Sequence, residues 1–200
     1  MKRLMFLLAV CGLLISCGST KGVSKSAGAK LNPVYVTNKA KFNLLPTDAA
    51  EKNIDAVQHF TAQFGGKSFE SDVLLIVDDE KLSMTILNEF GTTMGELNYN
   101  NDLVVFNSEL FPKGLKAEYI VADVQFCLYR ADALKKALEE IGLAFVVSTA
   151  DGENAVTETR SIFDGDKEIA RIEKTQTAQD KQITYTNYIR GYSYVLQGEF

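Results

Sequence analysis

The sequence predicts a mainly β protein of the α+β class, in which a strongly curved antiparallel sheet is covered by a helical lid. From about Ala56 onward, short β-rich runs are separated by turn residues at the spacing of antiparallel strands. Between Gly114 and Gly142 the pattern changes to one of helical length and composition. The length of 200 residues suits one domain behind an N-terminal extension.

The first segment, residues 1–16, has the features of a secretory signal peptide. Met1-Lys2-Arg3 supplies a positive start, and the uncharged run Leu4–Ile15 is too short to span a bilayer permanently. The sequence Leu14-Ile15-Ser16-Cys17 resembles the bacterial lipobox, whose cysteine receives diacylglycerol and becomes the new N-terminus. We therefore expect removal of residues 1–16, lipidation of Cys17 and stable attachment to a membrane.

The residues behind Cys17 indicate where the protein is attached and how. Gly18 looks like the default outer-membrane sorting signal of Gram-negative lipoproteins, so we expect the periplasmic face of the outer membrane. Residues 18–33 contain too few large apolar side chains to offset the entropy of ordering them. We expect the lipidated cysteine and a flexible tether at 17–41 and a single domain at 42–200.

Charge and cysteine content narrow the set of partners. The chain carries 21 Lys and Arg against 26 Asp and Glu, and loss of Lys2 and Arg3 would leave 19 against 26, a net charge of −7. Such an acidic protein is unsuited to a phosphate backbone, so nucleic acid is not expected as a partner. Once Cys17 is lipidated, Cys127 has no partner for an internal disulfide, and its apolar surroundings predict burial.

Three acidic or amide-rich segments are expected to be hairpin turns: Asp78–Glu80, Asn100–Asp102 and Asp164-Gly165. Near the C-terminus the apolar side chains change from odd to even positions at Arg190-Gly191. A β-bulge there would return six side chains to one face of a continuous strand. These side chains are Ile183, Tyr185, Ile189, Tyr192, Tyr194 and Leu196.

The helical region is expected to contain two helices. Lys116–Tyr129 has apolar side chains around nearly its whole circumference, which predicts cover on more than one side. In the second helix Asp132 is expected at the N-cap and Gly142 at the end, with one apolar stripe. That stripe comprises Leu134, Leu138 and Ile141. The expected order is about six strands, two helices and about four more strands.

Tests for catalytic chemistry give little. His59 is the only histidine and is expected at a solvated strand position, and no nucleophile elbow, phosphate loop or dinucleotide motif occurs. No zinc cluster can be assembled, and the acidic turns lack the spacing of a calcium loop. We expect no enzyme activity, no metal and no cofactor, although a hydrolase using a carboxylate pair stays an alternative that no local motif selects.

Asp123 is unusual because it falls in the most apolar sector of the first helix. An unpaired carboxylate there would be costly, so it should have a partner. Arg130 lies two turns away along the helix, which leaves backbone N–H groups or a strand arginine such as Arg190. Two roles stay open for Asp123, namely pinning the lid to the sheet and recognising the head group of a ligand.

Four segments resemble a known family: Phe90–Tyr99, Leu110–Pro112, Lys116–Asp123 and Asn187–Tyr194. The chain is similar, over about residues 56–200, to the uncharacterised lipoproteins encoded in aryl polyene biosynthesis clusters, which are related to LolB. The LolA and LolB relatives imply an incomplete antiparallel β-barrel with a helical lid and an apolar cavity that receives acyl chains.

The resemblance implies binding or transfer of a lipid-like ligand of the aryl polyene type in a cavity between sheet and lid. LolB uses a loop with an exposed leucine to insert its cargo, and no such loop is found in this sequence. Leu110–Pro112 is the nearest candidate for a tip that touches the membrane; the alternative is that it packs in the lid. The alternative function is that of an assembly factor that docks an enzyme or transporter of the same pathway. The expected ligand-binding residues are Tyr119, Ile120, Asp123, Val124, Arg190, Tyr192 and Tyr194.

Overall fold

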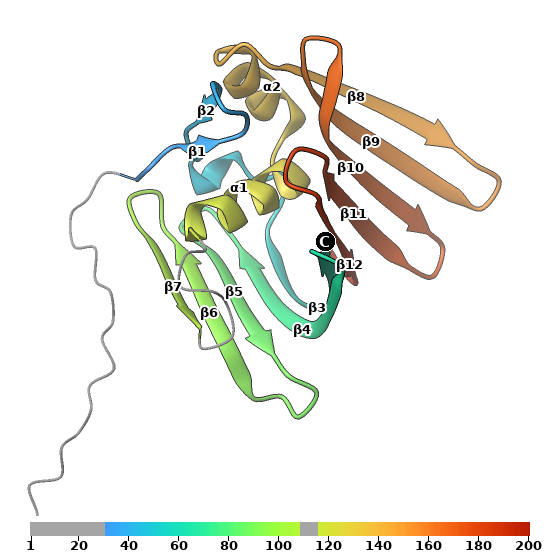
Figure 1. The fold of residues 1–200 in the computed structure, drawn as a ribbon. Helices are drawn as coiled ribbons and strands as arrows, with labels where there is room; N and C mark the ends of the chain where they lie inside the picture. Colours follow the sequence, from blue (N-terminus) through green and yellow to red (C-terminus); the bar gives the residue numbers. More distant parts are fainter. Residues whose placement is uncertain (1–30, 109–115) are drawn as a thin grey trace, which may run out of the picture.

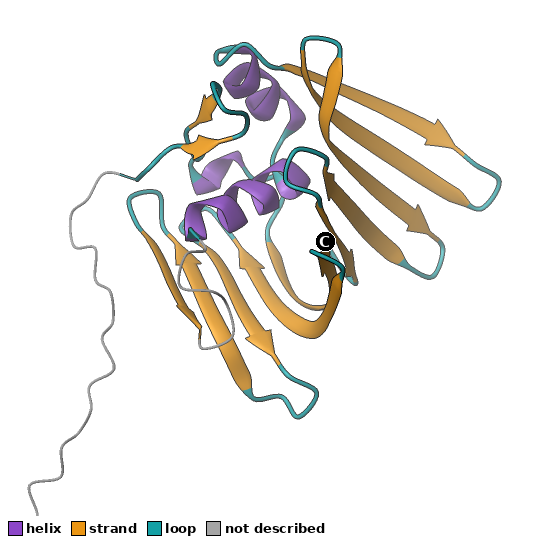
Figure 2. Cartoon of the chain, in the orientation of Figure 1, coloured by secondary structure: helices purple, strands orange, loops and turns teal. Residues whose placement is uncertain are grey.

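The computed structural model describes residues 31–108 and 116–200, which form one open antiparallel sheet with two helices (Figures 1 and 2). Cys17, the expected signal peptide and Leu110–Pro112 lie outside the described residues. The strands of the sheet are β3 (Ile54–Phe64), β4 (Lys67–Val77), β5 (Leu82–Leu87), β6 (Thr93–Tyr99), β7 (Val104–Ser108), β8 (Ala144–Asp151), β9 (Ala155–Asp164), β10 (Lys167–Thr177), β11 (Lys181–Asn187) and β12 (Tyr192–Gln197).

The strand order explains why helices cover the sheet. The ten strands are arranged β7-β6-β5-β4-β3-β12-β11-β10-β9-β8, so that β3 and β12 pair in the centre. The chain therefore runs outward to β7, crosses to the opposite edge at β8 and returns. The crossing carries α1 (Ala117–Leu128) and α2 (Ala131–Glu139). Consequently α1 contacts β7 on one half of the sheet and β10 and β11 on the other (Figure 1).

The mainly β class and the helical pair are confirmed, with five sheet strands on each side of the helices. Edges β7 and β8 do not pair, so the sheet is not closed, which is compatible with an incomplete barrel and a helical lid. The three predicted hairpin turns are also confirmed, between β4 and β5, β6 and β7, and β9 and β10.

The predicted β-bulge at Arg190-Gly191 is wrong. Residues 188–191 form a turn between two antiparallel strands, in which Gly191 has a φ of +67° and donates its N–H to the Asn187 carbonyl. The register pairs Asn187 with Tyr192 and Tyr185 with Tyr194. Odd positions of β11 therefore share a face with even positions of β12, and the change of parity comes from the reversal of the chain.

The packed part of the chain begins before the predicted domain start at residue 42. The hairpin of β1 (Val34–Tyr35) and β2 (Lys41–Phe42) buries Val34 and Phe42, so the expected tether does not extend to residue 41. The Phe42 ring lies 5.0 Å from that of Phe126 on α1. A 3-10 helix, η1 (Thr47–Ala49), follows. Thus α1 is covered by the sheet and by β1–β2, as its apolar circumference predicted.

The second helix begins earlier than predicted. Arg130, whose backbone is not helical, takes the N-cap position instead of Asp132, because the N–H of Leu134 already bonds the Arg130 carbonyl. Asp132 lies in the first turn. Leu134 and Leu138 are fully buried, and the chain leaves the helix at Gly142, whose φ of +81° suits a glycine.

Candidate functional site

The candidate site lies where α1 passes over the β11–β12 hairpin. The hydroxyl of Tyr192 donates a hydrogen bond of 2.5 Å to Asp123 Oδ2. Asn187 Nδ2 donates to the hydroxyl oxygens of Tyr185, at 3.1 Å, and Tyr192, at 3.4 Å. The antiparallel register brings these strand side chains to the same face, so Asp123 meets a small polar group within an apolar interface.

The surroundings of Asp123 change its acidity. Burial raises the pKa of its carboxyl group from 3.8 to about 7, and the hydroxyls of Tyr192 and Tyr185 and the charge of Arg190 offset only part of this rise. The pKa of Tyr192 is also raised, first by burial and then by the adjacent carboxylate. The carboxyl group therefore changes charge near neutral pH.

Arg190 joins three segments instead of pairing directly with Asp123. Its guanidinium carbon lies 4.4 Å from the centre of the Tyr119 ring, and Nη2 donates to the Tyr35 carbonyl at 2.5 Å. Tyr119 in turn accepts the Tyr35 N–H at 3.3 Å. Arg130 is occupied elsewhere, donating to the Asp48 carbonyl at 2.6 Å. The hydrogen-bond partner of Asp123 is thus Tyr192, and the contacts favour the pinning role.

A row of aromatic rings crosses the inner face of the sheet. Ring centres are 6.3 Å apart between Phe69 and Phe60, 5.7 Å between Phe60 and Tyr194, and 4.9 Å between Tyr194 and Tyr185. The four rings come from the adjacent strands β4, β3, β12 and β11. Phe60 and Phe69 are partly buried, whereas Tyr185 is fully buried. The row therefore becomes more accessible away from Asp123.

Cys127 packs at the buried end of this row. Its Sγ lies 3.5 Å from the Tyr194 hydroxyl, and the side chain has no exposed surface. Burial raises the pKa of the thiol to about 12, so it is kept as an unreactive thiol. The prediction that Cys127 is a buried small apolar residue is confirmed.

The centre of the interface between sheet and lid, where the sequence predicted an apolar cavity, is packed. Val124 and Tyr194 are only 4% and 9% exposed. Large tyrosine and phenylalanine rings fill that space. Tyr119, Ile120 and Tyr192 stay partly exposed, so the expected ligand-binding residues divide into a packed group and an accessible group.

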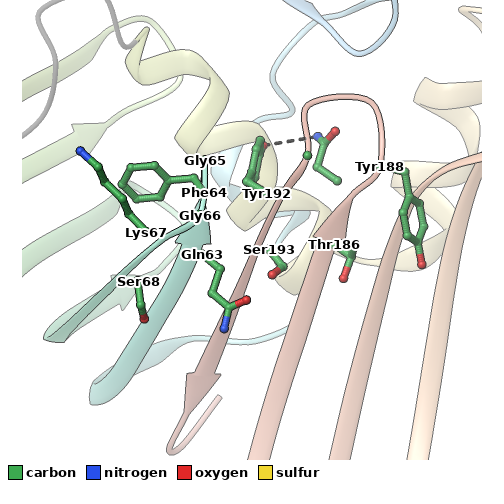
Figure 3. A pocket seen from close by; sticks show the side chains of 12 residues that line it. Gln63, Phe64, Gly65, Gly66, Lys67, Ser68, Thr186, Tyr188, Tyr192 and Ser193 are labelled. Atoms are coloured by element: carbon green, nitrogen blue, oxygen red, sulfur yellow. Dashed lines mark hydrogen bonds between the residues drawn. The ribbon is translucent and has the colours of Figure 1, made fainter.

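Two hollows are described, and both lie at the rim. One, of about 570 Å³, lies between the β3–β4 and β11–β12 turns (Figure 3). The other, of about 240 Å³, is lined in part by Glu51, Glu158 and Lys174.

The charges at the second hollow belong to a network centred on Arg160, whose side chain is fully buried. Arg160 bonds Glu51, Glu158 and the carbonyls of Phe126 and Tyr129. Lys174 Nζ lies 2.8 Å from Glu51 and 3.6 Å from Glu158. Burial alone raises the pKa of Glu158, but the Arg160 charge and hydrogen bond lower it on balance. The two carboxylates are thus neutralised ion-pair partners that tie β9 to the end of α1.

Sequence reasoning missed Phe90, which is 82% exposed at the tip of the β5–β6 hairpin. Asn88 Oδ1 accepts the N–H groups of Phe90 and Thr92, at 3.0 and 2.9 Å, and Gly91 has a φ of +72°. The turn therefore holds the ring outward. The available signal was a large aromatic residue between Asn88 and Gly91, inside a turn where polar residues are usual.

Other candidate positions add no reactive cluster. His59 lies on β3, exposed, with Nδ1 at 3.2 Å from Asp72 Oδ1, which agrees with the predicted solvated position. Within residues 31–108 and 116–200, no three His, Cys, Asp or Glu side chains come together as metal ligands. In the same ranges, no helix has both the length and the apolar character needed to cross a membrane.

A comparison with protein families finds a match over residues 55–197 to a family described as a protein of unknown function, DUF3261. The match covers nearly the whole sheet and both helices. A comparison with curated proteins finds no match.

Proposed function

The chain belongs to the DUF3261 family, a family of unknown function, and we propose from its own residues what it does. We propose that it is a non-catalytic lipoprotein that binds and transfers a lipid-like ligand. In this proposal the open sheet with its helices acts like the incomplete barrel of LolA and LolB, and the ligand is of the aryl polyene type. Cys17 would anchor the protein to the periplasmic face of the outer membrane.

The aromatic row on the inner face is the observation that carries the proposal. Its four strands span roughly 14 Å at an inter-strand spacing of about 4.8 Å, a length that suits part of an acyl or conjugated chain. Covering apolar surface contributes about 25 cal/mol per Å², and flat conjugated chains stack well on aromatic rings. The accessible end at Phe60 and Phe69 would receive the chain first.

Transfer needs a second feature, contact with a membrane, and Phe90 supports it. An aromatic side chain held outward at a rigid turn can enter the interfacial layer of a bilayer at little conformational cost. In the LolB-like interpretation, Phe90 replaces the exposed leucine that the sequence alone did not reveal.

Binding is tested with cis-parinaric acid, a fluorescent conjugated fatty acid. We expect saturable binding to the wild-type protein and a loss of affinity of about fivefold or more in Phe60→Ala, because the ring offers its apolar surface to the chain. Val57→Ala is the matched control, since Val57 lies on the same strand but is exposed on the opposite face. Equal affinity in the two variants would contradict the proposed site.

The natural ligand is sought by solvent extraction and mass spectrometry of protein purified from its host. We expect a lipid or polyene in the extract of the wild-type protein and less of it from Phe60→Ala. An extract without any lipid beyond the anchor of Cys17, together with no binding of parinaric acid, would refute lipid binding.

One observation favours the assembly-factor alternative. Strand β8 is an edge of the sheet, and its Val146 and Val147 are 51% and 40% exposed. A photo-crosslinker at Val147, compared with one at Val57, would then capture one dominant protein partner in cells. In that case extraction would recover no lipid cargo.

A further inference from the structure

The larger hollow lies between two neighbouring turns, outside the aromatic row. Its lining comes from the end of β3, the start of β4 and the β11–β12 turn with its flanking residues (Figure 3). Its volume of about 570 Å³ is within the range of small-molecule sites.

The charge of the lining restricts the ligand. Lys67 is the only charged side chain among the twelve residues that line the hollow, and no carboxylate is among them. A metal ion would lack acidic ligands, and a doubly charged anion would lack a second cation to neutralise it. An uncharged, polar ligand fits this lining.

Four hydrogen-bonding side chains form a row across the hollow. The register pairs Ser68 with Gln63, Gln63 with Ser193, and Ser193 with Thr186. Side chains of directly paired residues lie on one face about 5 Å apart, and Figure 3 shows these four pointing to the same side. Among residues 31–108 and 116–200, none of the four side chains has a hydrogen-bond partner, so their donors and acceptors are free for a ligand.

An aromatic ring and bare backbone complete the lining. Tyr188 is 47% exposed and points to the side of the four polar side chains, which leaves apolar ring surface beside them (Figure 3). Phe64 is equally exposed, but it follows Gln63 on β3 and therefore lies on the opposite face of the sheet. Gly66 and Gly191, with φ of +75° and +67°, have no Cβ and let a ligand approach the backbone closely. Sugars combine a ring edge of hydroxyls, each a donor and an acceptor, with apolar C–H faces that stack on aromatic rings.

We propose that the hollow between the β3–β4 and β11–β12 turns is a binding site for an uncharged saccharide. Ser68, Gln63, Ser193 and Thr186 hydrogen-bond its hydroxyls, and Tyr188 covers one face of the sugar ring. The site is distinct from the aromatic row of the proposed lipid binding, because none of Phe69, Phe60, Tyr194 and Tyr185 lines the hollow. The sugar comes either from a free saccharide or from the head of a glycolipid.

The full-length protein, extracted in a sugar-free zwitterionic detergent, is titrated with neutral methyl glycosides of hexoses and N-acetylhexosamines, and saturation-transfer NMR follows binding. We expect at least one of them to bind saturably. Gln63→Leu and, separately, the milder Ser68→Ala should each weaken binding, the former by about fivefold or more. Thr61→Val is the control, because Thr61 lies two residues from Gln63 on the same face of β3 and outside the hollow.

The proposal is overturned if no neutral glycoside binds, if Gln63→Leu and Thr61→Val bind equally, or if glucuronic acid or a sugar phosphate is preferred. Comparing octyl with methyl glycosides separates the two sources. If the octyl glycoside binds more tightly than the methyl glycoside, and this difference disappears in Phe60→Ala, the ligand is the head group of a glycolipid. Equal affinities for the octyl and methyl glycosides support a free saccharide. Parinaric acid binding is measured in parallel, so failure of the sugar site and failure of lipid binding are told apart.

Discussion

The hydroxyl of Tyr192 donates a hydrogen bond to the Asp123 carboxylate across 2.5 Å, which fastens the start of β12 to the middle of α1. Nearby, Arg190 and Tyr119 add a second fastening through Tyr35. Lid and sheet are therefore joined by a pair whose acidic member changes charge near neutral pH. This makes the attachment of the lid dependent on pH.

Asp123→Asn should remove this dependence. The pKa of Asp123 in the folded protein, about 7, lies above its ordinary value of 3.8, so folding favours the protonated acid. The contribution of Asp123 to stability is therefore highest below about pH 4, falls as the pH rises and levels off above pH 7. Between pH 5 and 8 the ionisation of Asp123 should lower the free energy of unfolding of the wild-type protein by about 2–3 kcal/mol. Urea unfolding of Asp123→Asn should show a decrease over this pH range that is smaller by that amount. Asp132→Asn is the control, because Asp132 is exposed on α2. Parallel profiles would contradict the assignment.

Tyr192→Phe should act in the opposite direction. It removes the donor from a partly buried carboxyl group, at a cost of about 1–3 kcal/mol. The cost is larger at pH 8, where the carboxylate is charged, than at pH 5. In an Asp123→Asn background the same change should cost less, because the remaining acceptor is neutral. Denaturant unfolding of both single variants and the double variant measures the coupling, and additive effects would argue against a direct bond. Tyr188→Phe, in the turn between the two strands, is the control.

Hairpins were the part of the fold that the sequence predicted best, because their turn residues act locally. Asp164-Gly165 is one example, since a glycine with positive φ determines the reversal within two residues. At Arg190-Gly191 the same local evidence was ambiguous. A bulge and a reversal both change the parity of apolar positions, and only the pairing of Asn187 with Tyr192 distinguishes them.

The site depended on contacts that no local pattern contains. Asp123 was recognised as needing a partner, but the choice of Tyr192 over Arg190 is made by the β11–β12 turn, which directs Arg190 to Tyr35. Likewise, whether the gap under α1 is filled depends on how the Tyr185 and Tyr194 rings stack in three dimensions. Arg160 was missed because a charged residue on a strand usually faces solvent, and its partner Glu51 is 109 residues away.

Arg160→Met should be among the most damaging single changes. It leaves Glu51, Glu158 and two backbone carbonyls without their buried donor, which we expect to cost about 3–5 kcal/mol in urea unfolding. Arg171→Met breaks the ion pair with Glu168, but the Arg171 side chain is 42% exposed, so about 1 kcal/mol or less is expected. Similar losses in the two variants would show that the Arg160 network contributes no more than a surface pair.

Cys17→Ser should abolish lipidation. In cells fed with labelled palmitate, we expect the label in the wild-type protein and none in Cys17→Ser, since the thiol is the acceptor in a lipobox. Cys11→Ser is the matched control, because Cys11 lies in the apolar run six residues earlier and should leave labelling unchanged. Labelled Cys17→Ser protein, or loss of the label in Cys11→Ser alone, would mean that the cleavage site was assigned wrongly.

Phe90→Ser should separate ligand binding from delivery. Because the ring is 82% exposed, its removal should change the free energy of unfolding by less than about 0.5 kcal/mol and leave parinaric acid affinity unchanged. Transfer of the bound probe to lipid vesicles, followed by its fluorescence, should slow several-fold, because the turn loses the side chain that enters the bilayer. Phe90→Leu, which keeps an apolar tip, should restore most of the rate. If Phe90→Ser delivers as fast as the wild-type protein, the β5–β6 turn is not the membrane contact and Phe90 has no role in transfer.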